Sequence, residues 1–273
     1  MDHKRRDLLK LAFLGATSCE HAQPQRSDVI PLALVQFDAR PEQLEHNTRQ
    51  IERLSEKAVE LGARWVMFHE GTLCDYTPNL KELAQFVPDG KWVRRIEALA
   101  RRLNCYISYG LSEADNGRYY IAQVFTGPRG FIHRYRKTWI WRTPDDKDYR
   151  DEWLRYDPGS GPELFTIDGV CATCFICADG ESKRCLTRVR DLSPEVVFHP
   201  NNRGKLGSFE GYAARARAAG APLLVTNRVG MSWNKPTTGG CVVYAANGDV
   251  LAHANREGRE EILRYDLKLA RTA

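Results

Sequence analysis

The stretch from residue 30 to residue 69 restricts the fold most, because its pattern changes from strand to helix and back. Ile30 to Phe37 form a continuous apolar run, as in a strand that is covered on both faces. Apolar residues then recur at helical spacing between residues 44 and 61, and Gly62 stands where such a helix would end. Residues 64–69 predict the next strand. This strand, helix, strand unit favours a fold of the α/β class.

The rest of the chain predicts the same class with mixed strands. A second helix is indicated over residues 92–103, and no linker or repeat divides residues 28–273, so we expect a single domain there. Asp115-Asn116-Gly117 and Asn247-Gly248 are typical hairpin signals. The further elements that we expect are strands at 105–112, 119–126 and 130–135, two strands between 164 and 177, a strand at 195–199, a helix at 208–219, and strands at 222–227, 240–244, 250–254 and 261–267.

Residues 138–161 interrupt this pattern. They are rich in Asp, Pro, Trp and Arg and have no clean period, which predicts a long loop. Long loops in compact domains often carry function, so we expect this loop to help shape a site. Trp139, Trp141, Trp153 and Tyr76 suit either the lining of a substrate pocket or packing in a core or dimer interface.

Residues 1–27 resemble a twin-arginine export leader. A basic segment from Lys4 to Lys10 precedes an apolar run, Leu11 to Ala16, that is too short to span a bilayer. Cys19 follows in a context similar to a lipoprotein processing site, so a lipid anchor at Cys19 is a further expectation. These features predict a periplasmic or membrane-anchored extracytoplasmic location. A basic N-terminal helix on a cytoplasmic protein is the alternative.

The charge of the chain points away from a nucleic-acid partner. Its net charge of +5 arises from 40 basic and 35 acidic residues, which are interleaved along the chain. This distribution is typical of a solvated surface of mixed charge. With 273 residues, 42% of them hydrophobic, the chain is long enough to bury a full core.

Three side chains with complementary chemistry, those of Glu70, Lys137 and Cys177, fall at or just past the ends of predicted strands. An α/β sheet presents residues at such positions to a ligand. A thiol with its ordinary pKa of about 8.5 is mostly protonated at neutral pH, so it needs a carboxylate to take its proton before it attacks a carbon-nitrogen bond. The charge that then develops on the carbonyl oxygen needs an ammonium group and a backbone N–H.

Cys177 also ends the series Cys171-x-x-Cys174-x-x-Cys177, a spacing that suits a metal ion or an iron-sulfur cluster. On a strand, however, residues three apart point to opposite faces, so their thiols do not converge on one ion. We therefore expect Cys171 and Cys174 to pack in the interior and expect no metal site. His69-Glu70 begins like a zinc-protease helix, but Leu73 stands where the second histidine is needed.

Four segments carry a family resemblance. They are Phe68-His69-Glu70-Gly71, Tyr135-Arg136-Lys137-Thr138, Glu152 six residues before Pro158-Gly159, and Ile176-Cys177-Ala178-Asp179. In this order and context the chain resembles the carbon-nitrogen hydrolase family, the nitrilase superfamily, and its amidase-like branch. The resemblance extends from about residue 30 to residue 266. Each segment is short, but their joint order across most of the chain is specific.

The resemblance implies a nitrilase-type αββα sandwich with mixed β-sheets, its four layers formed when two subunits pack, and a homodimer or higher homo-oligomer. It implies hydrolysis of a non-peptide carbon-nitrogen bond, of amide or carbamoyl type, in a small molecule. A thioester on Cys177 would form with Glu70 as the base, while Lys137 and the Ala178 backbone N–H hold the oxyanion. Glu152 would orient Lys137 and the substrate nitrogen. No metal and no organic cofactor is implied.

Three departures from the family pattern bear on the substrate. Gly180 to Arg184 lacks the Arg-Phe-Pro-Glu run of the amidase branch, Ala178-Asp179 replaces the Trp-Glu of the nitrile-cleaving branch, and His69 replaces the usual proline. The sequence therefore leaves the substrate open. A nitrilase or an N-acyltransferase that uses the same three residues, and a non-catalytic binding protein on the same scaffold, are the alternatives.

Overall fold

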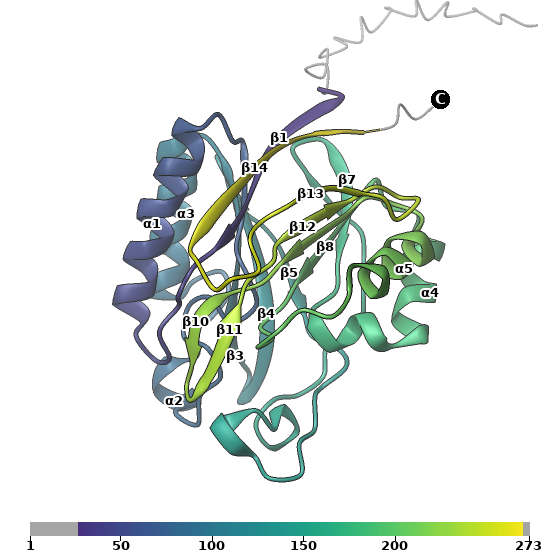
Figure 1. The fold of residues 1–273 in the computed structure, drawn as a ribbon. Helices are drawn as coiled ribbons and strands as arrows, with labels where there is room; N and C mark the ends of the chain where they lie inside the picture. The colour runs from purple at the N-terminus through teal and green to yellow at the C-terminus, as the bar shows by residue number, and fades with distance from the viewer. Residues whose placement is uncertain (1–26, 270–273) are drawn as a thin grey trace, which may run out of the picture.

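Two β-sheets of six strands each lie face to face in the computed structural model, which describes residues 27–269 (Figure 1). The first sheet consists, in spatial order, of β14 (Glu261–Lys268), β1 (Val29–Gln36), β2 (Trp65–Met67), β3 (Tyr106–Asp115), β4 (Arg118–Gly127) and β5 (Gly130–Arg136). β1, β2 and β3 are parallel to one another, whereas the other neighbouring strands pair antiparallel. The sheet is therefore mixed, as the sequence predicts.

The second sheet is mixed in the same way. Its strands, in spatial order, are β13 (Val250–His253), β12 (Val242–Tyr244), β9 (Leu223–Thr226), β8 (Val196–Pro200), β7 (Val170–Cys174) and β6 (Phe165–Ile167). β7, β8 and β9 run parallel, and the outer strands pair antiparallel. A separate hairpin, which the sequence patterns do not predict, is formed by β10 (Val229–Ser232) and β11 (Lys235–Thr238).

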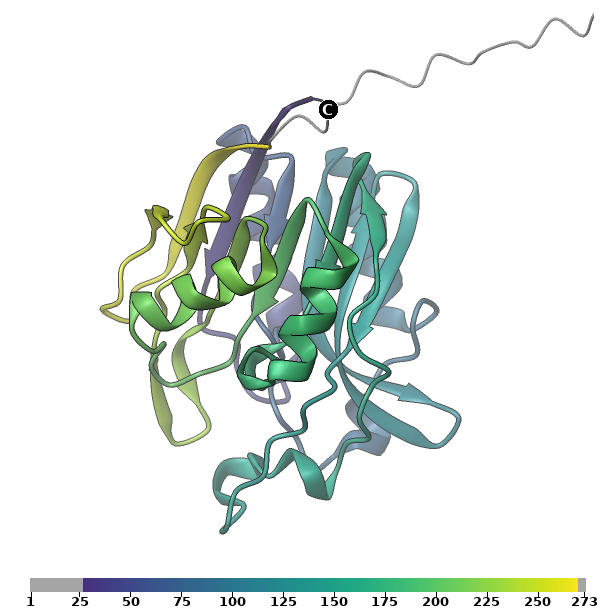
Figure 2. The same cartoon turned by 90° about the vertical axis from the view of Figure 1, so that its right-hand side faces the viewer.

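Helices cover the outer face of each sheet (Figures 1 and 2). The first sheet carries α1 (Leu44–Glu60) and α3 (Lys91–Leu103), and the second carries α4 (Lys183–Leu192) and α5 (Phe209–Ala219). A one-turn helix, α2 (Leu80–Leu83), precedes α3. A single chain thus supplies all four layers of the αββα sandwich, so the expectation that two subunits must pack to form them is wrong.

The strand β1 shows why the run that opens the fold is apolar on both faces. Leu32 and Leu34 pack in the core between the two sheets, while Val35 belongs to the separate core under α1 and α3. Across the sheet interface, the ring of Trp65 on β2 lies 5.7 Å from that of Phe198 on β8. Burial of a side chain of this size contributes about 1.5–3 kcal/mol, so these contacts hold the sheets together.

Both predicted hairpins are present. Asn116 and Gly117 connect β3 to β4 with φ values of 49° and 79°, the left-handed conformation that a tight hairpin turn requires. Asn247-Gly248 joins β12 to β13, and the N–H of Gly248 donates to the carbonyl of Ala245.

Two predictions near the expected nucleophile need correction. β7 ends at Cys174 rather than at Cys177, because the chain leaves the sheet before it reaches the thiol. The helix α4 was not expected, because only Cys185 and Val189 are buried in it, which is too sparse a set to show a period. Its start carries a recognisable signal, since the Ser182 side chain accepts the N–H of Cys185 as an N-cap.

The predicted export leader, with its possible anchor at Cys19, lies outside the described residues except for Ser27. Between residues 27 and 269, no helix is both long and apolar enough to cross a membrane. β14, near the end of the described chain, pairs along its full length with β1, near the beginning.

Candidate active site

The four predicted site residues meet where strands of both sheets end. Glu70 lies just after β2, Lys137 directly after β5, and Cys177 three residues after β7. Glu152 begins the 3-10 turn η2 (Glu152–Leu154) within the long loop. All four are buried, Cys177 being the most exposed at 7%. The structure therefore brings these residues together in the interior rather than at the surface.

Lys137 is held between two carboxylates. Its Nζ donates to Glu70 Oε1 at 2.8 Å and to Glu152 Oε1 at 2.6 Å. Burial by itself lowers the pKa of Lys137, but the charges of Glu152 and Glu70 outweigh it and raise that pKa well above its usual range. Burial, with the nearby charge of Glu70, raises the pKa of Glu152 despite its contact with Lys137. The ammonium group is thus charged at neutral pH.

The two carboxylates differ in what their second oxygen does. Glu152 Oε2 accepts the backbone N–H of Trp141 at 2.8 Å, which fixes this side chain to the long loop. Glu70 Oε2 is buried and has no hydrogen-bond partner among the described residues. A buried carboxylate oxygen without a partner is costly in a folded protein and is a natural acceptor for a proton from a reacting group. Glu70 is therefore the better placed of the two to act as a base.

Cys177 occupies a strained position. Its φ of 46° lies in the left-handed region, which residues with a side chain rarely adopt, and it opens the 3-10 turn η3 (Cys177–Glu181). Burial and the charge of Glu70 raise the pKa of the Cys177 thiol to about 11, although Lys137 and Arg203 act in the opposite direction. The resting thiol is therefore protonated at neutral pH and requires a base before it can act as a nucleophile.

Asp179 ties the turn that carries Cys177 to the segment that carries Lys137. This buried carboxylate accepts four hydrogen bonds, and because its donors come from both segments, it fixes their separation. The donors are the backbone N–H groups of Thr138, Trp139 and Ile176 and the hydroxyl of Tyr135. The sequence pattern places Asp179 in the nucleophile segment, but only the structure shows it as a positioning residue.

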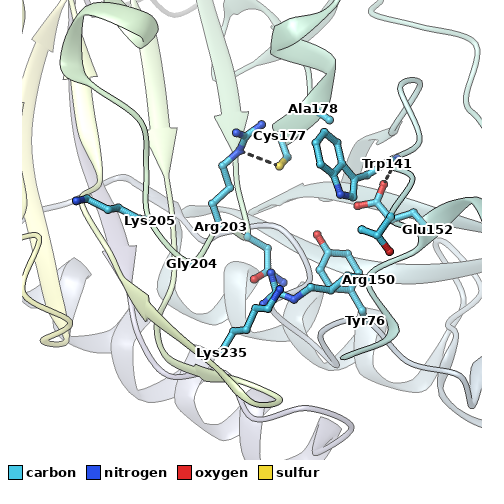
Figure 3. A pocket seen from close by; sticks show the side chains of 12 residues that line it. Tyr76, Trp141, Arg150, Glu152, Cys177, Ala178, Arg203, Gly204, Lys205 and Lys235 are labelled. Carbon is cyan, nitrogen blue, oxygen red and sulfur yellow. Dashed lines mark hydrogen bonds between the residues drawn. The ribbon is translucent and has the colours of Figure 1, made fainter. Parts of the chain in front are cut away.

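A cavity of about 390 Å³ opens above these groups (Figure 3). Cys177, Ala178 and Glu152 contribute to its lining, together with Tyr76 and Trp141, for which the sequence leaves pocket and packing roles open. Its size suits a small molecule. The other two tryptophans of the long loop, Trp139 and Trp153, instead border a separate depression of about 300 Å³.

Arg203 makes a contact that the sequence does not predict. Its Nε donates to the Sγ of Cys177 at 3.3 Å, and its Nη2 pairs with Glu181 Oε1 at 2.5 Å (Figure 3). The sequence gives only a weak signal, namely that Arg203 follows the end of the strand β8. Glu181 belongs to the segment after Cys177 that departs from the family pattern, so this departure holds a guanidinium group against the thiol.

Replacing Arg203 with methionine is expected to slow the reaction of Cys177 with iodoacetamide by about tenfold at pH 8, since a charge-assisted contact of about 1.4 kcal/mol is lost. The guanidinium favours the thiolate, so its removal raises the thiol pKa above its present value of about 11. The rate is measured against pH by mass spectrometry of the Cys177 peptide. Arg203→Lys should recover part of the rate, and an unchanged pH profile in Arg203→Met would contradict the assignment.

The other cysteines of the predicted series lie apart from this chemistry. Cys174 packs in the core between the sheets, and Cys171 is partly exposed on β7. Within residues 27–269, no three histidine, cysteine, aspartate or glutamate side chains are grouped so that they could hold a metal ion.

Comparison with known proteins identifies the family. The model of the family described as carbon-nitrogen hydrolase matches residues 31–273. The chain belongs to the carbon-nitrogen hydrolase family. A nitrilase from Pyrococcus abyssi is 27% identical to this carbon-nitrogen hydrolase over 253 residues, which cover 89% of the chain and 92% of the relative.

Solved structures agree with the fold of this carbon-nitrogen hydrolase. A superfamily protein from Xanthomonas campestris has a TM-score of 0.76 at 18% identity and covers 86% of this chain and 90% of its own. A variant of the amidase from Nesterenkonia sp. AN1 has a TM-score of 0.77 at 20% identity and covers 90% of this chain and 92% of its own. The predicted family and the predicted αββα fold are confirmed. Amidase and nitrilase relatives both occur, so the family alone does not distinguish the two activities.

Proposed function

We propose that this protein hydrolyses amide bonds of small molecules through a thioester on Cys177. The observation that carries the proposal is the position of Lys137, which is held charged between Glu70 and Glu152 below a cavity that Cys177 lines. Nucleophile, base and cation are the three groups that acyl transfer from an amide requires.

In the first half of the reaction, Glu70 takes the proton of the thiol as Sγ attacks the carbonyl carbon. The carbonyl oxygen becomes an oxyanion, which the ammonium group of Lys137 and the backbone N–H of Ala178 stabilise. Glu70 then passes the proton to the nitrogen, the carbon-nitrogen bond breaks, and ammonia or an amine leaves. Glu152 keeps Lys137 in place and charged throughout.

In the second half, Glu70 takes a proton from water, and the resulting hydroxide attacks the thioester carbon. The oxyanion forms again at the same position. The carbon-sulfur bond breaks, Glu70 returns its proton to the sulfur, and a carboxylic acid leaves. The two halves balance because the same carboxylate accepts and returns one proton in each.

A covalent probe tests this proposal. In a glutamate-to-glutamine variant of the amidase from Nesterenkonia sp. AN1, the acetamide moiety of fluoroacetamide adds covalently at the active-site cysteine. Incubation of this protein with fluoroacetamide should add one acetamide group at Cys177, identified by peptide mass spectrometry. Ammonia release from a panel of small amides should fall in step with that modification. Ammonia release that continues after Cys177 is fully modified would contradict the thioester mechanism.

Nitrile hydrolysis is the second candidate, and the likeness to the Pyrococcus abyssi nitrilase favours it. The same thiol would add to the nitrile carbon, and two water molecules would convert the adduct to acid and ammonia. Matched amide and nitrile pairs, compared by kcat/KM for ammonia release, separate the two activities. We expect the amide of each pair to be the better substrate.

A further inference from the structure

Cationic side chains line the cavity beside the reactive groups. Arg150 from the long loop, Arg203 after β8 and Lys235 at the start of β11 all line it. In Figure 3 the side chains of Arg150 and Lys235 point toward one another, whereas Lys205, at the rim, points away. Like charges that converge repel one another unless an anion lies between them.

The loop and the hairpin that carry these two cations are packed together by their neighbours in the chain. The ring of Tyr149, next to Arg150, lies 4.7 Å from the ring of Trp233 at an angle of 65°. Trp233 in turn donates its Nε1–H to the carbonyl of Tyr76 at 3.0 Å. The approach of Arg150 to Lys235 is therefore built into the packing of two separate segments rather than into one exposed side chain.

Arg150, Arg203 and Lys235 differ in whether an acidic side chain pairs with them. Arg203 forms an ion pair with Glu181 and also donates to Cys177 Sγ. Neither Arg150 nor Lys235 forms an ion pair with any side chain that the structure describes, and Nε and Nη2 of Arg150 are covered by protein without a hydrogen-bond acceptor. A guanidinium group with covered donors and no acceptor is poorly compensated, so a negative charge in the cavity would stabilise it.

The reactive end of the site lines the same cavity. Cys177 and Glu152 contribute to its lining together with Arg150 and Lys235. A small substrate with an anion at one end and a neutral amide at the other can therefore place its anion at the two cations and its amide toward Cys177.

We infer that the substrate carries a carboxylate that binds between Arg150 and Lys235 while its amide faces Cys177. This inference rests on the proposed amide hydrolysis and adds the chemical class of the substrate. The guanidinium group of Arg150 attracts a carboxylate by its charge, and the ammonium group of Lys235 adds a second positive charge. A cavity of about 390 Å³ has room for a short carboxy-amide.

Matched amides test the inference. Primary amides with a terminal carboxylate, in a series of increasing chain length, are compared with the same amides ending in a methyl group or a phosphonate. We expect kcat/KM for ammonia release to be about 10- to 100-fold higher for the best carboxylate than for its methyl counterpart, as one or two charged hydrogen bonds provide. An equal kcat/KM for both would overturn the inference while leaving the amidase proposal intact, and a preference for the phosphonate would replace carboxylate by phosphate.

Variants locate the effect. Lys235→Met on the exposed hairpin and Arg150→Met should each reduce the ratio of carboxylate to methyl substrate about tenfold, whereas Lys205→Met, which removes the same charge at the rim, should keep the wild-type ratio. Calorimetric binding of glutarate, a dicarboxylate of the product type, gives a readout that needs no turnover, and the dissociation constant should rise about tenfold in the first two variants only. Equal weakening in Lys205→Met would show a general charge effect and overturn the site.

Discussion

Replacing Lys137 with methionine should lower the free energy of unfolding by about 3–5 kcal/mol at neutral pH, because it leaves buried carboxylates without their cation. Lys137 is fully buried and makes hydrogen bonds to both Glu70 and Glu152. Methionine fills a similar volume, so the loss arises from charge rather than from a void. Turnover should fall below detection as well, since the group that faces the oxyanion is removed.

The cost of this substitution should depend on pH in a defined direction. Burial already raises the pKa of Glu152, and Lys137 is what opposes this rise. In the variant, the folded-state pKa of Glu152 rises further above the unfolded value of about 4.3, so the folded state binds a proton there more tightly. The variant should therefore be most stable near pH 4 and lose stability as the pH rises to neutrality, whereas the wild type, in which Lys137 opposes the rise of this pKa, should lose less.

Urea denaturation at pH 4.5 and pH 7.5 measures the difference. The double variant Lys137→Met with Glu152→Gln should recover part of the stability at pH 7.5, because one of the two unpaired charges is gone. Lys147→Met, which removes an exposed lysine from the same loop, serves as the control and should change stability by less than about 0.5 kcal/mol. A loss of stability in Lys137→Met that is equal at both pH values would show that the loss arises from packing and not from unpaired charge.

The ends of the strands explain why the sequence alone could predict that Glu70, Lys137 and Cys177 lie close together. Apolar runs mark β2 and β7, β5 is a predicted strand of mixed polarity, and each candidate follows one of these three strands within three residues. β3 is parallel to β2, and β4 is antiparallel to both β3 and β5. β5 therefore runs in the same direction as β2, and the two strands end at the same edge of the first sheet. A residue just past either strand must then lie near that edge.

The cationic wall could not be found in this way, because it is built from segments without a period. Arg150 lies in the long loop and Lys235 in a hairpin whose own strands are not apolar runs, and the packing of Tyr149 on Trp233 holds the two segments together. Arg203 is the intermediate case. The position of Arg203 after β8 is predictable from the sequence. Its orientation toward the thiol depends on its ion pair with Glu181, which lies 22 positions away in the chain.

One of the covering helices was also not predicted, for a related reason. The sequence patterns predict α1, α3 and α5 but not α4. Of the two helices that cover the outer face of the second sheet, only α5 is therefore predicted. α4 buries only two side chains and is amphipathic over ten residues. Short helices of this kind are fixed by the sheet they cover and not by their own pattern.

Replacing Glu70 with glutamine should lower kcat by about 10²- to 10⁴-fold and leave folding nearly unchanged, as expected for the loss of a general base. Glutamine keeps an oxygen that can accept from Lys137, and Glu152 still balances the ammonium charge. Activity and stability should therefore separate in this variant, in contrast to Lys137→Met. Thermal denaturation and steady-state ammonia release measure the two effects.

In Glu70→Gln, the Cys177 thiol should become easier to ionise while turnover falls. The charge of Glu70 helps to raise the pKa of this thiol to about 11, so its neutralisation should lower that pKa and increase the thiolate fraction at alkaline pH. The ultraviolet absorbance of the thiolate, titrated between pH 8 and pH 11 in wild type and Glu70→Gln, measures this change. Glu163→Gln, a substitution of an exposed acid, should leave both the titration and kcat unchanged. A thiol that becomes easier to ionise while turnover falls would show that Glu70 acts by moving the proton, because a residue that only supported the thiolate would move both quantities in the same direction.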